Sequence, residues 1–285
     1  MNRRRKCIGI IIKIGLVVIA VIFCYPIMFL LVGSFMSNGE LMENLGAVLG
    51  VSTEPASWSL LPFEPTLRHY IEVLLDSPEY FVMFWNSVKI GLGTLFGQCL
   101  IAIPAAWGFA TYKFRLKKSI FFLYIILMLM PFQATMLSNY LVMNQINLLD
   151  TLWAIVLPGV FSTFPVFIMF NFFRGIPKAL IEAARIDGAR ELDIFFRIGI
   201  PLGKAGIISS VVLEFLEYWN LIEQPMTFLN DKTKWPLSLY LPDIGVENAG
   251  FAFAASVITL IPAILVFFTG HNYLEQGIAS LGVKE

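Results

Sequence analysis

The sequence predicts an all-α, polytopic membrane protein with six transmembrane helices. Hydrophobic residues make up 58% of its 285 residues and charged residues only 14%, and the mean hydropathy is +0.76. Soluble domains are about 45–50% apolar and about 25% charged, so this composition excludes a soluble globular protein. Two further observations predict the class: long apolar runs separated by polar connections, and an uneven distribution of Lys and Arg among those connections.

Six apolar runs are long enough to cross a bilayer, which takes about 20 helical residues. In chain order they lie near residues 8–32, 84–110, 119–143, 152–173, 205–222 and 250–271. The first run follows Arg3-Arg4-Arg5-Lys6 and so resembles a signal peptide. Its apolar part exceeds the usual length of about 7–15 residues, and no A-x-A cleavage pattern follows, so we expect a retained helix.

Prolines recur in or beside the later spans. They are Pro104, Pro131, Pro158, Pro165 and Pro262. A proline frees a backbone carbonyl and can kink a transmembrane helix, so we expect either bends or local packing adjustments at these positions.

The connections alternate in their content of Lys and Arg, which accumulate on the cytoplasmic side of a membrane. Fifteen of the 20 Lys and Arg residues lie in the N-terminus, in 112–118, in 174–204 and in the C-terminal tail. The other connections hold only Arg68, Lys232 and Lys234, and two cations lie within spans. We therefore expect both termini to be cytoplasmic and the loops 33–83 and 223–249 to lie outside.

No motif in the chain predicts catalysis, a metal site or a cofactor. Gly199-Ile-Pro-Leu-Gly203-Lys204 lacks the spacing and the hydroxyl residue of a phosphate-binding loop. His69 and His271 are isolated in sequence, and the three cysteines have no C-x-x-C spacing. The formal net charge is zero, so nothing favours a nucleic-acid partner.

The connection 174–204, with 31 residues, is too long for a simple helix-to-helix turn. Pro177 suits the first turn of a helix, and Gly188 predicts a turn into a second short amphipathic segment. We expect two short helices parallel to the membrane. Their apolar side chains would dock into a partner or, alternatively, lie on the lipid surface. The expected contact residues are Leu180, Ala183, Ala184, Phe195, Phe196 and Ile198, with Arg185, Asp187, Arg190 and Glu191 at the rim.

This connection contains the most specific motif of the chain. Glu182-Ala183-Ala184-Arg185-Ile186-Asp187-Gly188-Ala189, followed by Phe195, Ile198, Pro201 and Leu202, resembles the EAA loop of carbohydrate ABC transporter permeases. The likeness extends to Leu149-x-Thr151-x-Trp153-Ala154, Phe173-Arg174-x-Ile176-Pro177, Trp219-Asn220 and Gly277-x-x-x-x-Gly282-Val283-Lys284. The chain is similar to the smaller permease subunit of maltose-type importers, a binding-protein-dependent transport inner membrane component. It departs from that pattern at Glu214, Glu217 and His271.

The resemblance implies a type I ABC importer permease fold, with residues 1–285 as a single transmembrane permease domain in a bacterial-type cytoplasmic (inner) membrane. It implies four kinds of partner: a second, different permease subunit, a dimer of ATPase subunits that binds ATP and Mg, an extracytoplasmic solute-binding protein and the sugar substrate. The EAA loop would couple closure of the ATPase dimer to alternating access. The residues expected to do so are Glu182, Ala183, Ala184, Asp187, Gly188, Ala189, Phe195 and Pro201. Glu182 would pair with a basic residue of the ATPase, and Gly188 would permit the bend.

Polar residues in the fifth span are candidates for the substrate pathway, because a charge at mid-bilayer costs at least about 2.5–3.5 kcal/mol. Glu214 and Glu217 are three residues apart, on one face together with Tyr218. Three roles stay open for them: sugar contact, an ion pair of Glu217 with Lys89, or a subunit interface. The aromatic ring of Trp219 and the carboxamide of Asn220 are suited to contact a sugar. For Trp219, a position in the aromatic belt at the membrane interface is an equal alternative.

The expected substrate is a neutral or amino-bearing oligosaccharide, because a uronate would meet like charge at Glu214 and Glu217. An ABC permease for a non-sugar solute and a secondary transporter are the alternatives, although the spans show no inverted repeat. A membrane-bound enzyme is a third class. It would need clustered His, Asp or Glu at one membrane face, which the sequence lacks.

Overall fold

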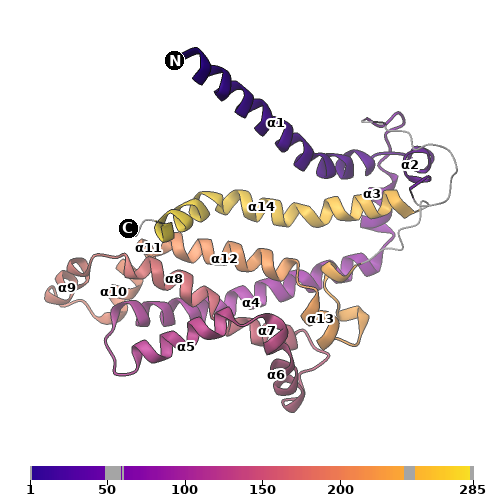
Figure 1. Ribbon diagram of the computed structural model, residues 1–285. Helices are drawn as coiled ribbons and strands as arrows, with labels where there is room; N and C mark the ends of the chain where they lie inside the picture. The colour runs from indigo at the N-terminus through magenta and orange to yellow at the C-terminus, as the bar shows by residue number, and fades with distance from the viewer. Residues whose placement is uncertain (1, 49–58, 60, 241–247, 283–285) are drawn as a thin grey trace. The chain divides into compact units, whose positions relative to one another are not determined.

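The computed structural model describes residues 2–48, 59, 61–240 and 248–282. Its described part is helical and contains no strand, which confirms the predicted all-α class (Figure 1). Parts of the predicted outer loops 33–83 and 223–249, and Val283 and Lys284 of the C-terminal motif, lie outside the described residues.

The helices in chain order are α1 (Asn2–Gly33), α2 (Asn38–Leu45), α3 (Arg68–Leu75), α4 (Pro78–Thr111), α5 (Lys117–Leu129), α6 (Phe132–Gln145), α7 (Trp153–Val160), α8 (Phe164–Arg174), α9 (Lys178–Ile186), α10 (Glu191–Ile194), α11 (Ile200–Leu202), α12 (Lys204–Trp219), α13 (Glu223–Phe228) and α14 (Ala249–Gly282). A π-helical turn, Phe195–Gly199, lies between α10 and α11, and two 3-10 turns, Lys232–Lys234 and Leu237–Leu239, follow α13.

Four segments of the described chain are long and apolar enough to cross a membrane: Ile12–Gly33, Pro78–Thr111, Trp153–Arg174 and Ala249–Glu275. Two bent pairs of helices bring the number to six if each pair is one span. The chain bends by 104° between α5 and α6. It bends by 68° between the helical segment Glu191–Leu202 and α12.

Pro131 accounts for the break between α5 and α6. It precedes the first residue of α6, and Met130 before it is extended, with ψ 130°. The proline ring disfavours the helical conformation in the residue that precedes it, so the helix ends there. The apolar run 119–143, expected as one span, is therefore two helices.

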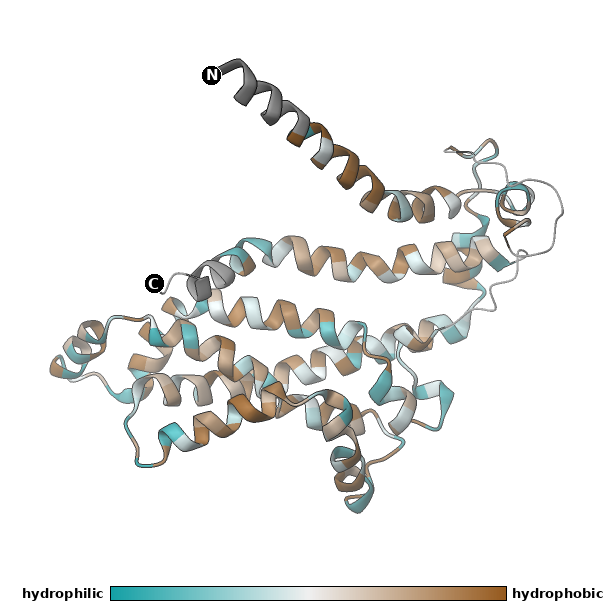
Figure 2. Ribbon diagram, viewed as in Figure 1, coloured by the Kyte–Doolittle hydropathy of each residue, from teal (hydrophilic) through white to brown (hydrophobic). Residues whose placement is uncertain are grey.

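The chain divides into two compact units, Met1–Tyr80 with Leu241–Ile261, and Phe81–Tyr240 with Pro262–Glu285. In the first unit, most apolar side chains of α1 between Ile12 and Met28 are exposed, and Figure 2 colours this stretch as mainly hydrophobic. Exposed apolar surface around a whole helix is typical of a helix that contacts lipid or another subunit.

The rest of the first unit has a small core that includes Met36 and Leu41. α2 begins with a capping box, in which the Ser37 side chain accepts from the Glu40 N–H and the Glu40 carboxylate accepts from the Ser37 N–H. His69 is buried, with its Nε2 3.2 Å from the Met36 carbonyl oxygen. This histidine and Glu40 therefore have structural roles within the unit.

The second unit holds the main core, which joins α4 and α8 to the connection 174–204. Trp107 of α4 and Phe173 of α8 pack edge-to-face, with ring centroids 5.5 Å apart. Ile181 of α9 and Ile194 of α10 are buried in the same cluster. Two residues of the long connection 174–204 are thus anchored on two membrane helices.

Candidate functional site

The predicted coupling loop, residues 174–204 and called the coupling loop below, contains α9 and α10, which are joined by a turn at Gly188. The end of α9 is a Schellman motif, because the Ala189 N–H donates to the Ala184 carbonyl at 3.0 Å and the Gly188 N–H donates to the Arg185 carbonyl at 3.1 Å. Gly188 has φ +81°, in the left-handed region, and no atom lies within 4 Å of the place of a Cβ. The turn lies where the sequence predicts it, and the backbone conformation alone requires glycine there.

A cluster of three side chains, Tyr112, Arg185 and Glu191, holds the turn in its conformation. The Arg185 guanidinium binds the Glu191 carboxylate through Nε at 2.7 Å and Nη2 at 3.1 Å, and the Tyr112 hydroxyl donates to the same carboxylate at 2.9 Å. The guanidinium holds the pKa of Glu191 below its ordinary value. Because both charges are partly exposed, the pair contributes at most about 1 kcal/mol, and its main effect is to set the angle between α9 and α10.

Part of the apolar surface expected to dock into a partner packs inside the chain instead. Ala184, Phe195 and Ile198 contact the core of the second unit, and Phe195 lies 5.9 Å from the Trp107 ring. The reason is geometric, because the turn folds α10 back toward α4 and α8. Ala189, another residue of the EAA motif, also packs partly against this core.

The exposed part of the coupling loop includes two large apolar side chains among charged ones. Ile186 is 86% exposed and Leu192 is 69% exposed, one on each side of the Gly188 turn. Neither residue was among the expected contact residues, although an apolar residue beside a turn in a charged segment is a signal that could have found them. Other exposed residues of the predicted motif and its surroundings are Leu180, Glu182, Ala183, Asp187, Phe196, Pro201 and Leu202.

The coupling loop continues into α12 through a close contact with α8. At Gly203 the chain bends before α12 starts, and a Cβ there would collide with the Phe173 ring. A Cβ at Gly206 would collide with the ring of Phe172 in the same way. Small residues at such positions let two membrane helices approach each other closely. The loop is thus held by α4, α8 and α12 together.

The residues expected to line a substrate pathway fall into two groups. Glu214, Tyr218 and Trp219 are buried within the second unit, whereas Glu217 and Asn220 are exposed. Trp219 packs between aromatic neighbours, with its ring 5.5 Å from that of Phe215 of the same helix and 5.8 Å from that of Phe84 of α4. Glu214 and Glu217 lie three residues apart on the continuous helix α12, as expected, but the first is buried and the second is exposed.

Glu214 belongs to a buried hydrogen-bonded bridge between helices. The Gln98 side-chain amide of α4 donates to the Glu214 carboxylate at 2.7 Å and to the Gly159 carbonyl at 3.0 Å. Gly159 lies next to the end of α7, where the chain leaves helical geometry before α8. One amide group thus joins α4, α7 and α12, and Glu214 is a structural residue of this bridge in the described chain.

The expected ion pair between Lys89 and Glu217 is not formed. Among the residues that the structure describes, the ion pairs join Arg68 to Glu72, His69 to Glu72, Arg185 to Glu191, Arg190 to Asp193, and Lys234 to Asp150 and Asp231. Glu217 is exposed on α12, where a group outside this chain can reach it.

Two exposed polar residues near the C-terminal end of α12 were not predicted. The Gln133 side chain of α6 donates to both carboxylate oxygens of Glu223 in α13, at 3.0 and 2.9 Å. Gln133 follows the Pro131 break, so the bend of the span carries this amide to α13. No sequence signal joins residues 90 positions apart.

The connection after α13, which is predicted to lie outside, is fixed by Asp150. Its carboxylate accepts from the N–H groups of Asn230 and Asp231, at 3.1 and 3.0 Å, and pairs with Lys234 at 3.0 Å. The Asp231 N–H, aided by the Lys234 ammonium, lowers the pKa of Asp150. A described part of the predicted outer loop 223–249 therefore has a defined conformation.

Comparison with known proteins gives a consistent result. Residues 99–280 match the family model described as "Binding-protein-dependent transport system inner membrane component". The chain is 31% identical over 281 residues to the arabinooligosaccharides transport system permease protein AraQ of Halalkalibacterium halodurans, with 96% of each chain covered. It is 29% identical over 205 residues to the lactose transport system permease protein LacG of Rhizobium radiobacter, covering 69% of this chain and 73% of that protein.

The fold also matches a solved structure. A bacterial ABC transporter involved in the import of the acidic polysaccharide alginate superposes with a TM-score of 0.81, covering 95% of this chain and 98% of that one. The sequence identity is 22%, so this likeness concerns the fold.

Proposed function

The chain belongs to the family of binding-protein-dependent transport system inner membrane components, and from this membership we propose that it is one permease subunit of an ATP-driven importer of carbohydrates. Its partners would be a different permease subunit, a dimer of ATPase subunits and an extracytoplasmic solute-binding protein. The names of the relatives, permeases for arabinooligosaccharides and lactose, support a sugar substrate. ATP and Mg would bind to the ATPase subunits.

The observation that carries the proposal is the way in which the coupling loop is built. It presents exposed apolar side chains, Ile186 and Leu192, and the exposed carboxylate of Glu182 to a partner. The same loop is anchored by Ile181 and Ile194 in the core formed by α4 and α8. A partner that displaces α9 therefore displaces membrane helices with it, which is what coupling of ATPase closure to alternating access requires.

Glu217 and Asn220 are the proposed contacts with substrate on α12, since both are exposed, and Gln133 and Glu223 add polar groups at the outer end. Carboxamides and carboxylates accept and donate the hydrogen bonds that sugar hydroxyls need. The carboxylates of Glu217 and Glu223 would repel an anionic sugar, which supports a neutral or amino-bearing oligosaccharide. The buried residues of the same helix would hold this surface in place by packing beneath it; they are Glu214, Tyr218 and Trp219.

The test is reconstitution of the chain with its partner subunits in proteoliposomes. We expect uptake of a neutral oligosaccharide to require ATP on the cytoplasmic face and the binding protein outside, and to continue when ion gradients are collapsed. Uptake driven by an ion gradient without ATP would instead identify a secondary transporter. Equal uptake of a uronate oligomer and a neutral one would refute the substrate class but leave the ABC assignment intact.

A further inference from the structure

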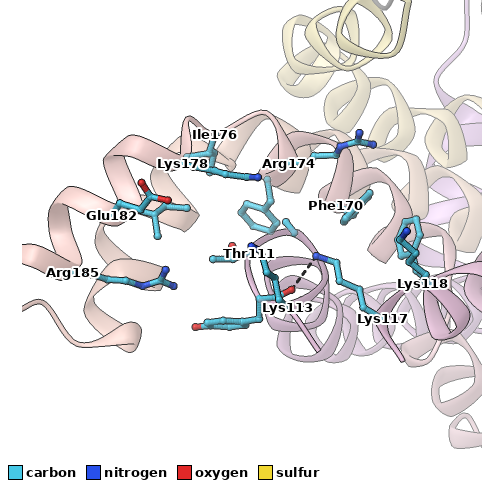
Figure 3. A pocket seen from close by; sticks show the side chains of 15 residues that line it. Thr111, Lys113, Lys117, Lys118, Phe170, Arg174, Ile176, Lys178, Glu182 and Arg185 are labelled. Atoms are coloured by element: carbon cyan, nitrogen blue, oxygen red, sulfur yellow. Dashed lines mark hydrogen bonds between the residues drawn. The ribbon is translucent and has the colours of Figure 1, made fainter. Parts of the chain in front are cut away.

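A pocket of about 1010 Å³ lies beside the coupling loop, between the connection 112–118, the end of α8 and α9 (Figure 3). Its lining is strongly basic. Glu182 is the one acidic residue among the lining side chains. The cations that line the pocket are Lys113, Lys117, Lys118, Arg174, Lys178 and Arg185.

Most of these cations have no counter-ion within the described chain. Arg185 is neutralised by Glu191, but the other five take part in no ion pair among the described residues. The Lys117 ammonium donates to the Tyr112 carbonyl oxygen at 3.0 Å, and Lys178, Arg174 and Lys113 all lie close enough to repel it. Like charges gathered in this way are stabilised by an anion placed among them.

Two helix N-termini add to the positive potential. α5 starts at Lys117 and α9 at Lys178, and neither has a side chain that caps its first N–H groups or an acidic residue in its first turn. The Lys117 N–H donates to the Phe114 carbonyl oxygen and the Leu180 N–H to the Pro177 carbonyl oxygen. The remaining N–H groups at such a terminus carry partial positive charge and bind phosphate oxygens well. The exposed basic residues and these N–H groups thus offer both charge and hydrogen bonds to one anion.

One side of the pocket is apolar and continues along α5. Phe121, Phe170 and Phe173 line the pocket. Farther along α5, the exposed side chains of Phe122 and Leu129 extend the apolar surface away from the basic end. A ligand that fits both parts has an anionic head and long apolar chains.

We propose that this pocket binds the phosphate headgroup of an anionic phospholipid from the cytoplasmic leaflet, with the acyl chains along α5. Basic pockets between transmembrane helices on the cytoplasmic side are suited to such headgroups, and the leaflet supplies them at high local concentration. Because Glu182 and Lys178 of α9 line the pocket, the lipid would contact the coupling loop directly.

The experiment uses the complex purified with its partner subunits and measures retained lipid by native mass spectrometry, with dioleoyl-phosphatidylglycerol and dioleoyl-phosphatidylcholine as probes. The test variant is Lys117→Gln with Arg174→Gln, and a second is Lys113→Gln with Lys118→Gln. The matched control is Arg115→Gln with Arg197→Gln, which removes two positive charges from the same membrane face but from residues that do not line the pocket.

We expect the unmodified complex and the control to retain phosphatidylglycerol in preference to phosphatidylcholine. Both pocket variants should retain at least tenfold less phosphatidylglycerol than the unmodified complex. Equal retention of phosphatidylglycerol by pocket and control variants, or equal retention of the two lipids, would overturn the proposal. Displacement of the lipid by millimolar inorganic phosphate would assign the site to a free anion instead. Loss of the ATPase subunits in the pocket variants alone would assign the basic residues to that protein interface.

Discussion

A single residue, Gly188, determines the geometry of the coupling loop. Its φ of +81° is strained for any residue with a Cβ, while the surrounding space is open. The usual difficulty of replacing a glycine, a steric collision, is therefore absent, and only the backbone conformation penalises a substitution. The penalty for a left-handed residue is about 1–2 kcal/mol, and it is smallest for asparagine.

Substitutions at Gly188 should consequently follow the order of left-handed preference. We expect Gly188→Val to reduce binding-protein-stimulated ATP hydrolysis several-fold, because the α9–α10 turn opens, while Gly188→Asn retains most of it. The measurement is ATP hydrolysis by the reconstituted complex at equal membrane content. Equal activity of the two variants would show that the turn is not required for coupling.

Glu182 offers a sharper test of the interface. It is exposed and forms no ion pair among the described residues, so its replacement leaves the fold of this chain unchanged. We expect Glu182→Lys to lower transport at least tenfold through repulsion of a basic group on the ATPase. Glu275→Lys, a charge reversal at an exposed position of α14, serves as the control and should transport normally. Normal transport by well-expressed Glu182→Lys would remove Glu182 from the coupling contact.

At the scale of elements, α4, α7 and α12 are joined by one buried polar bridge inside the second unit. Gln98 donates from α4 to both other elements, so each lost acceptor leaves a buried N–H without a partner. An unsatisfied buried donor costs about 1–3 kcal/mol. A matched apolar replacement of both partners avoids that cost, which separates a structural role from a substrate contact.

We therefore expect Glu214→Ala to lower the thermal stability of the purified complex, and Glu214→Gln, which keeps an acceptor oxygen, to change it little. The double variant Gln98→Leu with Glu214→Leu should recover most of the loss. Thermal unfolding of the detergent-solubilised complex measures all three. A stable Glu214→Ala complex with altered sugar preference would instead place Glu214 in the pathway.

The contact between α9 and α10 should depend on pH in the acidic range only. The pKa of Glu191 is lowered by Arg185, so this carboxylate stabilises the turn above its unfolded pKa of about 4.3, and the effect is lost as pH falls through the lower, folded value. Spin labels at Ala183 and Leu192 should show a single distance at neutral pH that broadens below about pH 4. Glu191→Gln should be broad throughout, and a sharp distance in that variant would contradict the role of the pair.

For the whole molecule, the distribution of Lys and Arg predicts the orientation in the membrane. The coupling loop is expected on the cytoplasmic side and the segment after α13 outside. In a chain with its three cysteines replaced, Lys232→Cys should react with a membrane-impermeant maleimide added to intact cells, and Arg197→Cys only after permeabilisation. The reverse pattern would invert the topology and exclude an ATPase contact at the coupling loop.

The sequence alone determined the helical class, the number of apolar runs, the turn at Gly188 and, through the EAA motif, the family. These properties follow from local quantities: the transfer free energy of each run, the conformational preference of one glycine and the residues of one continuous segment. Each of these quantities depends on one continuous segment, so it can be predicted without knowing which distant residues are in contact.

Tertiary structure decided which side of each helix is inside. Glu214 and Glu217 are three residues apart, yet only the former meets Gln98 of α4. The Glu191 carboxylate is held by Tyr112, and the basic pocket joins Lys117 to Lys178, each pair from segments far apart in sequence. Lipid tails are as apolar as a protein core, so a membrane helix carries little contrast between its buried and lipid-facing sides. Helical periodicity then gives the relative directions of side chains but not which neighbour covers them, and only packing determines that.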